Sequence, residues 1–173
     1  ICLVLESLGY LTGDGGREVS EQGRMLARIY AELDLVAAEC IRAGMFAGLT
    51  HPQLAAVLAS LVFEPRKTDQ ASRRPRMPDA RTNDAMTQIR RIWREVSLVE
   101  RDSRLERGPE PDIGFSEVAY GWAAGRTLPV VLEGTDLTAG DFGRWVRQVA
   151  DFAGQIADAA GPALVQHHRR GHA

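Results

Sequence analysis

Lysine is nearly absent from this chain of 173 residues: Lys67 is the only one, and arginine supplies the rest of its 21 basic side chains. With 23 acidic residues the net charge is only −2, which excludes a global field that would draw the whole chain onto nucleic acid or an anionic membrane. Binding to either would need a local patch. Arginine suits bidentate contacts with phosphate, but the same skew also arises from genome composition, and both explanations stay open.

Cysteine is scarce, and long apolar runs are lacking. Cys2 and Cys40 form no CxxC pair and sit in apolar stretches, so we expect two buried free thiols in a reducing cytosol. The sequence shows no charged n-region followed by an apolar h-region, and no apolar run approaches the roughly 20 residues of a membrane span. We therefore expect a cytoplasmic protein without membrane contact. Because the chain begins at Ile1, inside the amphipathic run ICLVLESLGYL, we expect it to be a piece of a longer polypeptide.

Catalytic signatures are also lacking. The chain contains no HExxH, GxSxG or GxxxxGK[ST] motif and no DExD or DExH box. Three tail histidines have no neighbouring ligands that would support a metal ion, namely His167, His168 and His172. The sequence therefore predicts no catalytic residue, no metal site and no cofactor within this chain.

Helical periodicity runs through most of the sequence, and 45% of the residues are hydrophobic, enough for a buried core. The glycines at 13–16 lie between two short extended stretches and predict one small hairpin. We expect six or seven helices and an all-α multi-helix bundle. The helices are expected in 1–8, in two pieces of 24–46 that break near Glu32 to Asp34, in 51–64, 86–105, 115–125, briefly after 125, and in about 139–160.

Local signals mark several helix ends. Thr50 is a typical N-cap with Pro52 in the first turn, which makes His51 part of a cap rather than a catalytic base. Thr138 is a second expected N-cap, Gly125 is expected to end one helix, and Gly161 with Pro162 to end the last.

The segment 65–81 is rich in arginine and proline and lacks apolar periodicity, so we interpret it as a loop or mobile linker. Its basic run either faces water or contacts phosphates. The candidates for phosphate contact are Arg73, Arg74 and Arg76.

Residues 140–151, GDFGRWVRQVAD, carry two sets of side chains at helical spacing. The apolar set is Phe142, Trp145, Val146 and Val149. The polar set is Arg144, Arg147, Gln148 and Asp151. Spacing alone does not tell whether the polar set faces water or a ligand.

Several strings, in order, resemble the C-terminal helical domain (DSHCT) of Ski-type DExH RNA helicases, particularly the actinobacterial group. They cover most of the chain outside the arginine-rich linker and the tail. The strings are LGYL (8–11), QGRMLARIYAELDLVAAECIRAGMFAGL (22–49), HPQLAAVLASLVFE (51–64), RIWREV (91–96), GFSEVAYGWAAGRTL (114–128) and DLTAGDFGRWVRQVADFAGQIADAAG (136–161).

The resemblance implies a three-part division: the end of a winged-helix unit in 1–22, the helical bundle in 23–162 and a basic tail in 163–173. It also implies a single-stranded RNA partner and two RecA-like motor domains that bind ATP and Mg²⁺ and drive 3′ to 5′ unwinding. A ratchet-like helix would line the strand's exit path, with Arg144, Arg147, Gln148 and Asp151 toward the RNA. Gln148 stands where the family often has a basic residue.

Two alternatives stay open. The polar set belongs to a structural or protein-docking bundle without nucleic-acid contact, or the chain is the equivalent domain of a DNA helicase. Sequence does not separate RNA from DNA here, because single-strand channels contact phosphates and stacked bases rather than the sugar.

Overall fold

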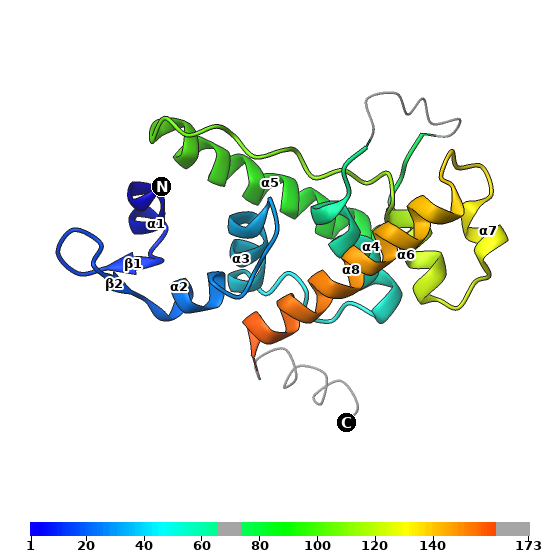
Figure 1. Ribbon diagram of the computed structural model, residues 1–173, viewed down its shortest axis with the longest axis horizontal. Helices are drawn as coiled ribbons and strands as arrows, with labels where there is room; N and C mark the ends of the chain where they lie inside the picture. The colour runs from blue at the N-terminus through cyan, green and yellow to red at the C-terminus, as the bar shows by residue number, and fades with distance from the viewer. Residues whose placement is uncertain (66–73, 162–173) are drawn as a thin grey trace.

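A computed structural model describes residues 1–65 and 74–161. In these ranges the chain forms eight helices and one antiparallel pair of short strands (Figure 1), which confirms the all-α class and adds a helix to the expected six or seven. The elements are α1 (Cys2–Ser7), β1 (Leu11–Thr12), β2 (Glu18–Val19), α2 (Glu21–Leu26), α3 (Asp34–Arg42), α4 (His51–Val62), α5 (Ala80–Asp102), α6 (Ser116–Ala123), α7 (Leu128–Leu132) and α8 (Ala139–Ala160).

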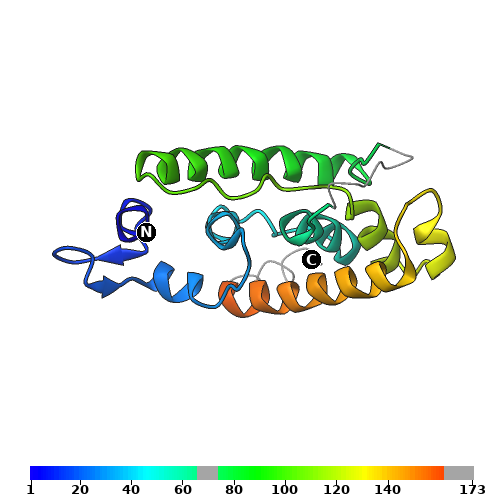
Figure 2. The same cartoon turned by 45° about the horizontal axis from the view of Figure 1, so that its top comes forward.

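The two longest helices enclose the bundle. Figure 2 shows α5 along one side and α8 along the other, with α3, α4 and α6 between them. Helix α4 packs on α5, α6 and α8, and every residue from Ala56 to Leu61 is buried. A helix that is apolar all round suits this central position, whereas α5 and α8 each bury a single face. Their outer faces are therefore available to other molecules.

Capping boxes begin three of the helices. The predicted caps are confirmed: Thr50 begins α4 and Thr138 begins α8. Helix α5 begins at Ala80, earlier than predicted, because the Asp79 side chain accepts a hydrogen bond from a backbone N–H of its first turn. The prediction of a linker over 65–81 is therefore wrong at its end, where the last two residues are helical.

The predicted pair of helices in 24–46 is present with different bounds. Helix α3 begins at Asp34, as expected, but α2 ends at Leu26, so the break covers residues 27–33. Ser20 starts α2 earlier than predicted by accepting a hydrogen bond from the N–H of Gly23. The predicted boundary between residues 22 and 23 consequently falls inside a helix.

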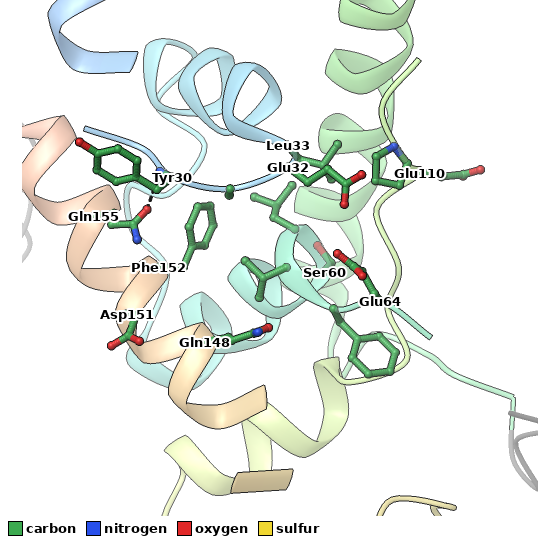
Figure 3. Close-up of a pocket in the computed structure, with 15 residues that line it drawn as sticks. Tyr30, Glu32, Leu33, Ser60, Glu64, Glu110, Gln148, Asp151, Phe152 and Gln155 are labelled. Atoms are coloured by element: carbon green, nitrogen blue, oxygen red, sulfur yellow. Dashed lines mark hydrogen bonds between the residues drawn. The ribbon is translucent and has the colours of Figure 1, made fainter. Parts of the chain in front are cut away.

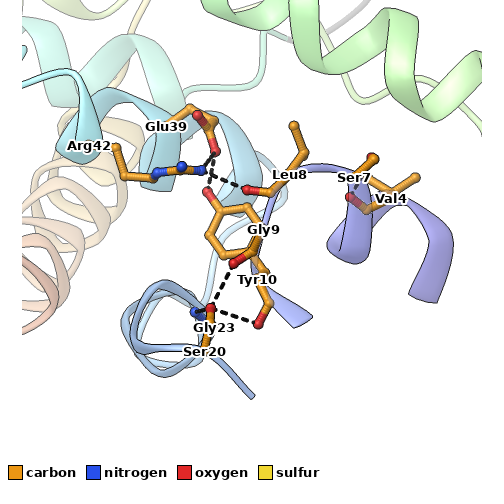
Figure 4. Close-up of polar contacts among 9 residues, drawn as sticks. All are labelled: Val4, Ser7, Leu8, Gly9, Tyr10, Ser20, Gly23, Glu39 and Arg42. Carbon is orange, nitrogen blue, oxygen red and sulfur yellow. Dashed lines mark hydrogen bonds and ion pairs between the residues drawn. The ribbon is translucent and has the colours of Figure 1, made fainter. Parts of the chain in front are cut away.

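The N-terminal helix and hairpin are fixed to α3 by polar contacts (Figure 4). The Tyr10 hydroxyl donates a 2.6 Å hydrogen bond to Glu39 Oε1. Arg42 donates to the same oxygen at 2.7 Å and to the carbonyl of Leu8 at 2.8 Å. Burial of the ring, helped by the bond to Glu39, raises the pKa of Tyr10 well above its ordinary value. The predicted hairpin is thus present and firmly joined to the bundle.

The two thiols differ in environment. Cys40 is buried as expected, and burial raises its pKa to about 12. The expectation that Cys2 is buried is wrong: it is exposed in the first turn of α1. That helix buries only Val4, and residues two apart on a helix point in nearly opposite directions.

Candidate nucleic-acid interface

Helix α8 has the two faces that its sequence predicts. Val146 is partly buried, and the other expected apolar side chains pack into the core together with two from the next turns. The buried side chains are Phe142, Trp145, Val149, Phe152 and Ile156. All four predicted polar residues are exposed, namely Arg144, Arg147, Gln148 and Asp151.

The polar side chains do not form one uniform patch. Arg144, Gln148 and Asp151 follow each other at intervals of four and three residues, so they lie in one row along the helix, and Gln155 continues it. Arg147 lies beside this row, further from the core. Gln148, Asp151 and Gln155 of this row line the groove described next.

A groove of about 310 Å³ opens beside this row. Its walls are α8, the C-terminal end of α4 and the segment 30–33 (Figure 3). Gln148, Asp151 and Gln155 line it, whereas Arg144 and Arg147 do not. The structure therefore brings two of the four predicted residues to a concave surface and leaves the two arginines on the open surface next to it.

The non-helical segment 27–33 forms one wall because α8 holds it in place. The backbone N–H of Tyr30 donates a 2.7 Å hydrogen bond to Gln155 Oε1, drawn in Figure 3. Arg28 donates to the carbonyl of Asp158 at 2.9 Å. The opposite wall includes Glu110, in a segment anchored by a 3.0 Å hydrogen bond from the N–H of Asp112 to the carbonyl of Ser60.

The groove is acidic. Among its lining residues in the described ranges are four carboxylates and no arginine or lysine. The carboxylates belong to Glu32, Glu64, Glu110 and Asp151. A hydrogen bond with Glu32 raises the pKa of Glu64 above its ordinary value; burial and the Glu32 charge add to this, and nearby Arg144 opposes it. Arg90 lies 3.7 Å from Glu110. Arg144 and Arg90 thus lie close to a groove whose lining carries only negative charge in the described ranges.

Arg144 is partly held by its own helix. Its guanidinium carbon lies 4.7 Å from the centre of the Trp145 ring, and Nη2 lies 3.7 Å from Asp141. The side chain is still 51% exposed. Such weak surface contacts restrict the arginine without neutralising its charge.

The other predicted basic contacts lie elsewhere. Arg74 lines a second groove, of about 350 Å³, between α6 and α7. Arg76 pairs with Glu117 of α6 at 3.1 Å. Neither lines the groove beside α8. Arg73, Pro162 and the tail at 163–173, with His167, His168 and His172, lie outside the described residues.

Tyr30 is a feature of this surface that the sequence did not reveal. Its side chain is 79% exposed at one end of the groove, beside Gln155 (Figure 3). It lies in the apolar run RMLARIYAELDLV, which predicted a buried helix. No local signal distinguishes it from the buried residues around it, because its exposure follows from the break between α2 and α3.

Residues 1–65 and 74–161 contain neither a cluster of metal-ligating side chains nor a membrane-spanning helix. No group of three or more histidine, cysteine, aspartate or glutamate side chains there is arranged to hold a metal ion. No helix in these ranges combines the length and apolar character needed to cross a bilayer.

Residues 16–172 match the DSHCT (NUC185) domain family. The chain belongs to this family. The DSHCT chain is 39% identical over 151 residues to the probable helicase HelY of Mycobacterium tuberculosis, covering 82% of the chain and 17% of that relative. It is 30% identical over 162 residues to the ATP-dependent RNA helicase mtr4 of Schizosaccharomyces pombe, covering 91% of the chain and 14% of that relative.

The same region is 25% identical to the exosome RNA helicase MTR4 of Homo sapiens, over 91% of the chain and 15% of the relative. The DSHCT chain thus spans only about a sixth of the length of the relatives it matches. The family resemblance expected from the sequence is confirmed.

Proposed function

We propose that this DSHCT chain is the RNA-contacting C-terminal accessory domain of an ATP-dependent DExH helicase of the Ski type. Helix α8 acts as the ratchet-like helix along the exit path of a single strand. Arg144 and Arg147 contact its phosphates, and Gln148 and Asp151 face its bases. ATP and Mg²⁺ bind to RecA-like motor domains outside these residues, and this domain supports 3′ to 5′ unwinding in the cytoplasm.

The observation that carries this proposal is the arrangement on α8. Two exposed arginines lie on α8, with Arg144 close to Glu64, and amide and carboxylate groups line the groove beside the helix. Guanidinium groups suit phosphate oxygens, and amides and carboxylates suit the hydrogen-bonding edges of bases.

A comparison of paired substitutions in the full-length protein tests the proposal. Arg144→Ala with Arg147→Ala should raise the RNA concentration that half-stimulates ATPase activity and slow unwinding of a duplex with a 3′ single-stranded extension. The matched control is Arg91→Ala with Arg94→Ala, which removes two exposed arginines from α5, on the opposite side of the bundle (Figure 2). The control should behave like wild type.

The alternative of a structural or docking bundle predicts wild-type behaviour for both pairs. If the α8 pair leaves RNA stimulation and unwinding unchanged, the assignment of α8 to the strand path is wrong. Equal losses with an otherwise identical DNA extension would favour the DNA-helicase alternative.

A further inference from the structure

The groove beside α8 presents a large exposed aromatic ring to solvent. Tyr30 is 79% exposed, the highest value among the exposed large hydrophobic side chains of the described ranges. Its backbone is fixed to Gln155 at 2.7 Å, so the ring projects from an anchored position. Leaving an aromatic ring in water forgoes the free energy of burying it, whereas stacking against a nucleobase recovers much of that free energy.

The charges around the groove decide which part of a strand can enter it. Carboxylates line the interior and would repel a phosphate. Arg144 and Arg147 lie on the open surface alongside. A strand running along α8 would therefore keep its phosphates on the arginines and turn its bases toward the groove. At about 310 Å³ the groove has room for a base.

We propose that Tyr30 is a stacking platform for one base of the single strand, and that a base further along the strand presents its edge to Glu32 and Glu64 at the other end of the groove. The inference rests on the proposed function, because it adds a second contact to the strand that α8 is proposed to bind. The carboxylates of Glu32 and Glu64 are joined by a hydrogen bond, so the pair holds at most one proton and presents mainly accepting oxygens. Cytosine donates through an exocyclic amino group at N4. Uracil can donate only through N3–H, which lies between two carbonyl oxygens that carboxylates would repel. The groove thus favours cytosine over uracil.

Binding of fluorescein-labelled single-stranded oligo(C) and oligo(U) RNA to the full-length protein without nucleotide tests the platform. Tyr30→Ala should weaken oligo(C) binding by roughly five- to a hundredfold, the usual value of one stacked base. Tyr30→Phe, which keeps the ring, should bind within about twofold of wild type. The salt dependence should stay unchanged in both, because no charge is removed.

Crosslinking gives a second readout that does not depend on affinity. Strands that carry 5-iodocytidine at successive positions are irradiated on the wild-type protein, and a crosslink mapped to Tyr30 is expected. Base choice is tested by the ratio of affinities for oligo(C) and oligo(U). This ratio should exceed one and fall toward one when Glu32→Gln and Glu64→Gln are combined.

The outcomes separate this inference from the proposed function. If Tyr30→Ala binds like wild type while Arg144→Ala with Arg147→Ala binds weakly, Tyr30 is no platform, but α8 still contacts RNA. If neither variant weakens binding, the proposed function itself is wrong. Crosslinks only to other residues would overturn the stacking role, and equal affinity for oligo(C) and oligo(U) would overturn the orientation of the base.

Discussion

The backbone N–H of Tyr30 donates a 2.7 Å hydrogen bond to the side-chain carbonyl oxygen of Gln155, a residue 125 positions further along the chain. This bond ties the break between α2 and α3 to the surface of α8. The segment 30–33 forms one wall of the groove, and the bond sets the position of the exposed Tyr30 ring. The proposed RNA contact depends on this junction as much as on the polar row of α8.

Loss of the Gln155 acceptor should loosen that wall. Gln155→Ala removes the partner of the Tyr30 N–H, and we expect the free energy of unfolding to fall by about 0.5–1 kcal/mol, the low end for a hydrogen bond because water can replace the lost acceptor. Gln155→Glu keeps an acceptor oxygen and serves as the control. Urea unfolding of the two variants and wild type provides the measurement, and an equal loss in both variants would contradict the role of this bond.

Tyr10 should stabilise the junction between hairpin and bundle. Tyr10→Phe removes the donor of a bond to the Glu39 carboxylate, and the free energy of unfolding should fall by about 1–2 kcal/mol, because Arg42 still pairs with Glu39. The pKa of Tyr10 is raised in the folded state. The stabilisation is therefore complete below the ordinary tyrosine pKa of 10.0 and declines as the pH rises above it.

The pH dependence distinguishes the hydrogen bond from simple packing. Denaturant unfolding at neutral pH and at a pH above the ordinary tyrosine pKa should show a smaller difference between wild type and Tyr10→Phe at the higher pH. A difference that stays constant across this range would argue against Tyr10 as the titrating group.

Gly143 lowers the stability of α8 without a steric reason. A glycine inside a helix costs about 1 kcal/mol relative to alanine, and a Cβ at Gly143 would meet nothing within 4 Å. We therefore expect Gly143→Ala to raise the free energy of unfolding by about 0.5–1 kcal/mol. Thermal unfolding of Gly143→Ala and wild type measures this difference in stability.

Gly23 offers the matched contrast. It also lies in a helix, but a Cβ there would meet the carbonyl oxygen of Tyr10. Gly23→Ala should therefore lower the melting temperature while Gly143→Ala raises it. A destabilising Gly143→Ala would mean that α8 is not a regular helix at this point.

Local signals were enough to predict much of the fold. The caps at Thr50 and Thr138 and the two faces of α8 depend on neighbours within a few residues, and these predictions are confirmed. The break at 27–33 was misplaced because its run is apolar and helix-like, and its backbone partners lie on the distant α8. Cys2 was misjudged for a related reason: the six-residue helix α1 buries only one side chain.

The site could be predicted only in part. The polar residues of α8 follow from periodicity, and their assignment to RNA came from the family resemblance. The groove itself could not be predicted, because it needs α4, α8 and the segment 30–33 to meet in space. Tyr30 and the paired carboxylates of Glu32 and Glu64 therefore became visible only in the structure.

The most direct test of the account is the salt dependence of RNA binding by the full-length protein. The logarithm of the association constant for a single-stranded RNA is measured against the logarithm of salt concentration, for wild type, for Arg144→Ala with Arg147→Ala and for the Arg91→Ala with Arg94→Ala control. Two lost phosphate contacts should make the slope shallower by roughly 1.4, at about 0.7 per contact on a single strand, with the control unchanged. An unaltered slope and affinity in the α8 variant would contradict RNA contact by this helix.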